Sequence, residues 1–139
     1  MKKYLFAIIA IFLLTGAITA TVWWIAPSTP IKSLDGCEIA EIEVFCGSTG
    51  KAFTVTDADT VKAIADGVTD TTLRKSGWSK NIDGYSYYLT FIDEGGEAIG
   101  SVIVDSADTL RCDPFFYRSS KPLPFDLLRS LEEEANTNE

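Results

Sequence analysis

The hydrophobic positions of the chain form one long block, followed by short segments in which apolar and polar residues alternate. Residues 4–26 contain no charged residue and no proline, and 20 of the first 26 residues are hydrophobic. A helix of this length would extend roughly 34 Å, which is enough to cross a hydrocarbon core of about 30 Å. The pattern therefore predicts a transmembrane anchor over residues 1–26, in contact with the lipid bilayer through residues 4–26.

The residues at the two ends of this block predict its orientation. Lys2 and Lys3 are the only charged residues before Lys32, and positive charge favours the cytoplasmic side of a membrane. Trp23 and Trp24 lie at the other end, where indole rings prefer the membrane interface. We therefore expect a single-pass protein of the cell membrane, with its N-terminus in the cytoplasm and its C-terminal domain extracytoplasmic.

A cleaved secretory signal is the alternative interpretation of the same block. Residues 5–14 would form its apolar region, and residues 18–20 place small side chains near a cleavage point. The apolar run continues through residues 22–25, however, and exceeds the roughly 7–15 residues usual for such a region. The anchor is favoured, with secretion after cleavage as the alternative, and both interpretations place residues 31–139 outside the cytoplasm.

After the block, the apolar spacing changes between the period of a strand and that of a helix. Alternation predicts strands over residues 38–46, 51–56, 85–93, 97–105 and 109–112, with a further short strand at 115–118 as an option. Val61, Ile64, Ala65 and Val68 have the spacing of one buried helix face, which predicts a helix over residues 57–69. Thr56 and Asp59 resemble a capping box at its start, and a second helix is expected from Pro122 to about residue 135.

This order of elements predicts an α+β fold. Strands joined by short turns pair in antiparallel fashion, so we expect a small two-layer domain in the order β-β-α-β-β-β-α, with both helices packed on one face of the sheet. The expected organisation is an anchor over 1–26, a tether over 27–37, an extracytoplasmic domain over 38–135 and a disordered tail over 136–139. Residues 74–81 are expected to form a polar loop.

Charge and composition exclude several classes of function. The net charge of −8 includes the two N-terminal lysines, so residues 27–139 carry 10 basic and 20 acidic side chains. So acidic a domain repels phosphate, and nucleic-acid binding is not expected. The chain has no histidine, which excludes Ser-His-Asp catalysis, Cys-His proteolysis and histidine-ligated zinc.

The remaining motifs do not support catalysis. Ser48 and Lys51 match the S-x-x-K pattern of serine acyl-transfer enzymes, but they lie in an expected exposed hairpin turn, where lysine stays protonated. Gly50 and Lys51 lack the other residues of a phosphate-binding loop. Asp57 and Asp59 are better explained by helix capping than by a calcium loop. We therefore expect no enzymatic activity, no cofactor and no metal site.

The three cysteines leave two interpretations open. Cys46 and Cys112 each share strand parity with apolar neighbours, so both side chains should point into the same core. A disulfide between Cys46 and Cys112 is the preferred pairing, because disulfides persist outside the cytoplasm. Buried free thiols are an almost equal alternative.

One basic cluster in the acidic domain is a candidate for partner binding. Arg74, Lys75 and Lys80 surround Trp78, and together they could contact an anionic headgroup, a wall polymer or an acidic protein surface. The preferred interpretation, however, is a solvated loop in which Trp78 folds back onto the core. Tyr88 is a further candidate, because strand alternation places it on the face opposite its tyrosine neighbours.

These observations predict a non-enzymatic function. We expect a membrane-anchored extracytoplasmic domain that binds or modulates an envelope or membrane protein. The alternative is a module that binds a small ligand or wall polymer through the loop around Trp78.

Overall fold

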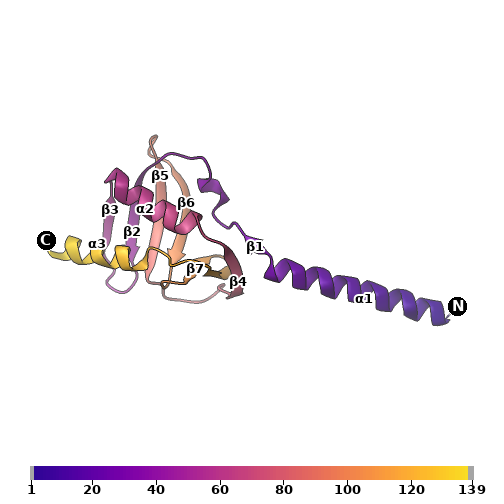
Figure 1. The fold of residues 1–139 in the computed structure, drawn as a ribbon. Helices are drawn as coiled ribbons and strands as arrows, with labels where there is room; N and C mark the ends of the chain where they lie inside the picture. The colour runs from indigo at the N-terminus through magenta and orange to yellow at the C-terminus, as the bar shows by residue number, and fades with distance from the viewer. Residues whose placement is uncertain (1, 138–139) are drawn as a thin grey trace.

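The alternating segments form strands of one sheet and the periodic segments form helices, as Figure 1 shows. The computed structural model describes residues 2–137. Its helices are α1 (Lys2–Ile25), η1 (Lys32–Leu34, a 3₁₀ turn), α2 (Ala58–Thr69) and α3 (Phe125–Thr137). Its strands are β1 (Pro27–Ser28), β2 (Ile39–Cys46), β3 (Ala52–Val55), β4 (Leu73–Trp78), β5 (Tyr87–Asp93), β6 (Ala98–Val104), β7 (Thr109–Cys112) and β8 (Phe115–Ser119).

Within residues 2–137, eight strands form one sheet in the order β1-β4-β8-β7-β6-β5-β2-β3, and all neighbouring strands are antiparallel. The predicted α+β class and antiparallel pairing are therefore confirmed. The predicted order β-β-α-β-β-β-α is wrong, because β1 and β4 form where a tether and a polar loop were expected. The optional strand at 115–118 is present as β8.

Both helices of the domain lie across the same face of the sheet (Figure 1). The positions of α2 that the spacing predicts to be buried are buried: Val61, Ile64, Ala65 and Val68. From α3, Leu128 is fully buried in the same core, and Phe125 and Leu131 pack at its border. Residues 136 and 137, expected in the tail, are helical, and the rest of the expected tail lies outside the described residues.

The start of α2 differs from the prediction by one residue. Asp57 is the N-cap, and its carboxylate accepts hydrogen bonds from the backbone nitrogen of Thr60 at 3.0 Å and from its hydroxyl at 2.7 Å. These bonds favour the ionised form and lower the pKa of Asp57. The predicted capping box of Thr56 and Asp59 is therefore wrong, because Asp57 binds the free amide of the first turn instead.

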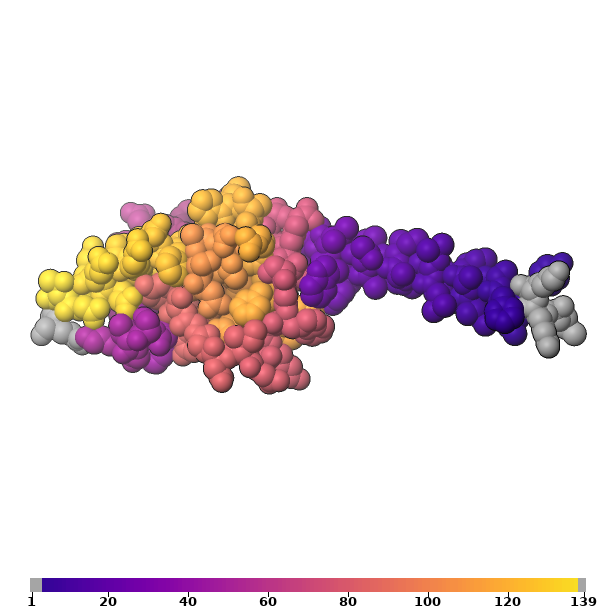
Figure 2. Space-filling model, turned by 90° about the horizontal axis from the view of Figure 1, so that it is seen from below, coloured from indigo at the N-terminus to yellow at the C-terminus, as the bar shows by residue number. Residues whose placement is uncertain are grey.

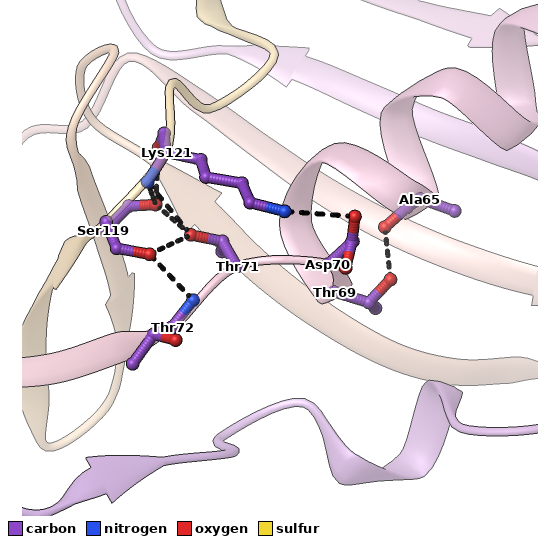
Figure 3. Close-up of polar contacts among 8 residues, drawn as sticks. Ala65, Thr69, Asp70, Thr71, Thr72, Ser119 and Lys121 are labelled. Carbon is purple, nitrogen blue, oxygen red and sulfur yellow. Dashed lines mark hydrogen bonds and ion pairs between the residues drawn. The ribbon is translucent and has the colours of Figure 1, made fainter.

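Strand β4 is short of apolar residues and forms because partners distant in sequence provide its hydrogen bonds. It pairs with β8 on one side and with β1 on the other. Figure 3 shows how the turn before β4 is joined to the end of β8. The hydroxyl oxygens of Thr71 and Ser119 are 2.5 Å apart, and Lys121 forms an ion pair with Asp70 at 3.2 Å. Sequence alternation within residues 74–81 alone does not reveal such pairing.

Residues 27–37 pack against the domain, where a tether was expected. Pro27 and Ser28 form β1 and extend the edge of the sheet beside β4. Ile31 and Leu34 are both buried in the hydrophobic core. The chain therefore joins the sheet two residues after the end of α1.

Helix α1 projects from the domain as an isolated rod (Figure 2). Over Tyr4–Ile25 its mean hydropathy is 2.4, and none of its most apolar part is buried. Among the described residues, it is the one helix long and apolar enough to cross a membrane. A membrane anchor and a signal peptide both have this character.

Candidate functional site

The end of α1 meets the sheet through four aromatic rings, which we call the junction cluster: Trp23, Trp24, Trp78 and Phe115. The ring of Phe115 lies 5.8 Å from that of Trp23, 6.0 Å from that of Trp24 and 4.6 Å from that of Trp78, measured between centroids. Phe115 is buried, but Trp78 is 61% exposed and Trp23 is 54% exposed. Trp78 therefore packs against Phe115 and leaves most of its surface uncovered.

Two basic residues of β4 bind the backbone at the end of α1. Arg74 donates a hydrogen bond to the carbonyl oxygen of Ile25 at 2.5 Å, and Lys75 donates one to the carbonyl oxygen of Trp23 at 3.1 Å. The last carbonyls of a helix have no partner within the helix and carry its negative dipole end. Arg74 and Lys75 thus satisfy acceptors that would otherwise be free, and they complement the helix dipole.

The structure divides the predicted binding residues into separate groups. Arg74, Lys75 and Trp78 come together at the end of α1. Lys80 is exposed two residues beyond Trp78, at the margin of this group. Tyr88 lies on β5, four strands away from β4, which corresponds to about 19 Å across a sheet. Tyr88 also faces the opposite side of the sheet, so it belongs to a different surface.

The uncovered side of the sheet carries a second group, which we call the aromatic patch: Phe45, Tyr85 and Tyr88. Phe45 pairs with Tyr88 across β2 and β5, and Tyr88 pairs with Ile103 of β6. The Tyr85 ring lies 6.2 Å from the rings of both Phe45 and Tyr88. Phe45 is 38% exposed and Tyr88 is 37% exposed.

The aromatic patch borders a shallow hollow of about 630 Å³. Polar side chains of Glu43, Thr54 and Thr90 lie along its margin. The hollow thus has an aromatic row on one side and a polar row beside it.

The alternation of β5 correctly places Tyr88 on the face opposite Tyr87. The expected place of Tyr85 opposite Tyr88 is wrong, because Tyr85 precedes β5 and packs beside Tyr88. Phe45 and Tyr85 were not among the predicted binding residues.

A buried arginine holds the loop that carries Tyr85. Arg111 of β7 is 4% exposed and donates hydrogen bonds to the carbonyl oxygens of Ile82, at 2.9 Å, and Gly84. Its guanidinium also lies 3.4 Å from the carboxylate of Asp105. Burial nevertheless dominates at Asp105 and raises the pKa of its carboxyl. Arg111 therefore connects the residue 79–86 loop to the sheet and positions Tyr85.

A polar cluster lies between α3 and the sheet. Glu132 accepts a hydrogen bond from the hydroxyl of Tyr87 at 2.8 Å and another from the hydroxyl of Thr49 at 3.0 Å. The bond from Tyr87 lowers the pKa of Glu132, while burial and the carboxylate raise the pKa of Tyr87. An acidic run near the C-terminal end of a helix, such as residues 132–134, is ordinarily solvated. The structure instead shows Glu132 bonded to the domain.

Cys46 lies beside this cluster and is fully buried. Burial, followed by the charge of Glu132, raises the pKa of its thiol to about 11. Nucleophilic cysteines require the opposite shift, because the thiolate is the reactive form. The arrangement of Cys46, Tyr87 and Glu132 therefore supports the packing of α3.

The preferred Cys46–Cys112 disulfide is not formed in the structure. Both cysteines are free thiols, as is Cys37. The parity argument is correct in placing Cys46 in the core and Cys112 against the core from the same side. The two residues lie on β2 and β7, which are three strands apart, or about 14 Å. A disulfide requires Cα atoms within about 7 Å, so strand order prevents the pairing.

The described residues contain no group of three or more Asp, Glu, Cys or His side chains placed to hold a metal ion. Comparisons with protein-family models, curated proteins and solved structures give no match for this chain. The junction cluster and the aromatic patch are therefore the two surfaces of the domain that point to a function.

Proposed function

We propose that this protein is a single-pass membrane protein whose extracytoplasmic domain binds an envelope or membrane protein, without catalysing a reaction. The aromatic patch on the uncovered face of the sheet carries this proposal. Helix α1 would be the anchor. The protein bound by the domain would contact Phe45, Tyr85 and Tyr88.

The composition of the open face supports a protein partner. When one face of an antiparallel sheet contacts water, its outward positions are normally polar. Here Phe45 and Tyr88 occupy such positions side by side. Aromatic residues are enriched in the centres of protein interfaces, where a polar rim surrounds them. Glu43 and Thr90 provide such a rim.

The properties of α1 support the anchor. Its 22 residues from Tyr4 to Ile25 suit the hydrocarbon core, and the two tryptophans near its end suit the interface. Lys2 and Lys3, in the sequence before the apolar run, favour a cytoplasmic N-terminus. The domain would then lie on the extracytoplasmic side, as would the aromatic patch.

A non-catalytic role agrees with the chemistry of the domain. Histidine is absent from the chain, and the thiol of Cys46 is kept protonated at neutral pH. The polar cluster around Glu132 joins α3 to the sheet, so its hydrogen-bonding groups have a structural role.

The hollow beside the aromatic patch favours a second candidate function. Its volume of about 630 Å³ is within the range of small-molecule sites. Aromatic rings at such a site could stack on a sugar ring of a wall polymer. This moves the alternative ligand site away from Trp78 and onto Tyr85 and Tyr88.

Site-specific crosslinking in membranes would test the two candidates. A photoreactive amino acid replaces Thr90, at the margin of the patch, in the full-length chain. We expect one discrete protein adduct that is lost in the Tyr88→Ala background and retained in the Glu133→Ala background, since Glu133 is exposed on α3. Titration of the Tyr85 and Tyr88 fluorescence with purified wall glycans tests the second candidate. Absence of both the adduct and a glycan response would overturn the assignment of the patch.

A further inference from the structure

We infer that the domain itself contacts the lipid–water interface of the bilayer that α1 crosses, with Trp78 inserted among the phospholipid headgroups beside Trp23 and Trp24. This inference rests on the proposed function in one respect, namely that α1 crosses a bilayer. It adds a second membrane contact, made by the sheet, and so a defined orientation of the domain.

The direction of β4 places Trp78 toward the membrane. The chain leaves α1 and runs away from it as β1, and β4 pairs with β1 in antiparallel fashion, with Arg74 opposite Pro27. Strand β4 therefore runs back toward α1, and Trp78 is its last residue. Figure 1 shows β4 at the side of the domain nearest to α1. An anchor that crosses the membrane thus brings the end of β4 close to the membrane surface.

The aromatic contacts confirm the level of Trp78 relative to the helix. Phe115 lies between Trp78 and the two tryptophans of α1, within 6.0 Å of each ring. Trp23 and Trp24 precede the end of α1 by one to two residues, so they mark the depth at which the helix reaches the interface. Trp78 packs on the same phenyl ring, which keeps it close to this depth.

The exposure of Trp78 fits a lipid interface. Its indole is 61% exposed, the highest value among the described large hydrophobic residues outside α1. Indole rings bury their apolar body among acyl chains and direct the N–H group to headgroups or water. A phospholipid interface therefore satisfies both parts of this side chain.

The charges of the domain agree with the same orientation. Arg74 and Lys75 place their positive groups at the end of α1, at headgroup level, although residues 27–139 carry an excess of acidic side chains. The acidic run at residues 132–134 lies on α3, whose C-terminal end points away from α1 (Figure 1). The domain thus places Arg74 and Lys75 near the phosphate groups and the acidic end of α3 in the solvent.

Fluorescence quenching by lipid would test the inference in the full-length chain. Three variants separate the tryptophans: Trp23→Phe/Trp24→Phe retains Trp78, Trp78→Phe retains the two tryptophans of α1, and a distal reporter combines Tyr88→Trp with phenylalanine at all three native positions. Each is reconstituted into vesicles of phosphatidylcholine and phosphatidylglycerol, with or without bromine on the upper acyl chain. Circular dichroism verifies that each variant is folded.

We expect brominated lipid to quench most of the Trp78 emission and to leave the distal reporter unquenched. The Trp78 emission maximum should also lie at a shorter wavelength than that of the distal reporter. If Trp23 and Trp24 are quenched and Trp78 is not, the inference is overturned while the anchor stands. If Trp23 and Trp24 are themselves unquenched, the anchor and the proposed function fail together with the inference.

Discussion

The ammonium group of Lys75 lies 3.9 Å from the centroid of the Trp23 ring and donates a hydrogen bond to the carbonyl oxygen of the same residue. A single side chain of β4 therefore binds both the ring and the backbone of a residue in α1. Together with the Arg74 bond to Ile25, this contact fixes the end of α1 to the edge of the sheet.

We expect the Lys75→Met substitution to loosen the connection between α1 and the domain. The loss of the cation–π contact alone corresponds to about 1 kcal/mol, or roughly fivefold faster local opening. Hydrogen exchange of a peptide covering residues 26–29, measured in detergent micelles, would detect this change. The matched Lys80→Met substitution should leave the exchange rate unchanged. Equal rates in all three proteins would contradict the contact.

The Arg111→Lys substitution should destabilise the domain by about 2–4 kcal/mol. An ammonium group cannot reproduce the hydrogen bonds that the buried guanidinium donates to the carbonyl oxygens of Ile82 and Gly84. Urea unfolding measures the loss. Arg118→Lys is the control, since Arg118 is exposed and forms a surface ion pair with Asp108 at 2.7 Å. We expect that control to change the free energy of unfolding by less than about 0.5 kcal/mol. A similar effect at both positions would show that Arg111 does not hold the loop.

Glu132→Gln should lower the free energy of unfolding at pH 7 by about 1–2 kcal/mol, because it removes a charged hydrogen-bond acceptor from Tyr87. The pKa of Glu132 is lower in the folded protein than its ordinary value of 4.5. Its contribution is therefore complete above pH 4.5 and is lost as the pH falls through the folded value. The variant should lose less stability on acidification than the original protein. Glu133→Gln, one residue further along, should behave like the original protein at every pH.

Cys46 should make the domain sensitive to alkali. Its pKa rises from 9.0 in the unfolded chain to about 11 in the fold. A raised pKa means that the stabilising contribution is complete below pH 9 and is lost between pH 9 and about 11. Two pKa units correspond to at most about 3 kcal/mol. Unfolding of the Cys46→Ala variant should show a weaker alkaline loss, whereas Cys37→Ala, at an exposed position, should retain the full dependence.

The free state of the cysteines gives a further prediction. Non-reducing mass spectrometry of the denatured, alkylated protein should find three modified cysteines per chain. In the folded protein, Cys37 should react first, because it is exposed while Cys46 is buried. A peptide linked through Cys46 and Cys112 would instead require β2 and β7 to be neighbours.

The sequence predicts those helices and strands whose hydrophobic spacing can be recognised within one short segment. The four apolar positions of α2 identify their helix because one period relates them all. Residues 73–78 show no such pattern, since Arg74, Ser76 and Gly77 are untypical of a buried strand. They become β4 through pairing with β8 and β1, which are distant in the sequence. The prediction of a loop at 74–81 is thus wrong because the strand there depends on long-range pairing.

The candidate site, too, could be predicted only as far as local sequence patterns allow. Alternation indicates on which face Cys46, Cys112 and Tyr88 lie, and these faces agree with the structure. It does not indicate which strands are neighbours, so neither the separation of the two cysteines nor the distance of Tyr88 from Trp78 could be predicted. Glu132 was missed for a related reason: its partner Tyr87 is 45 residues away in sequence.

The pairing of β1 with β4 would limit how far a membrane-anchored domain could search for a partner. A free, extended chain over residues 27–37 would allow the domain to move roughly 37 Å from the membrane surface. Because Pro27 and Ser28 are already part of the sheet, this length of free chain is absent. The proposed protein therefore explores only a thin layer next to the bilayer by lateral diffusion. A partner of the proposed anchored domain would then need its own binding surface within that layer, as another membrane protein has.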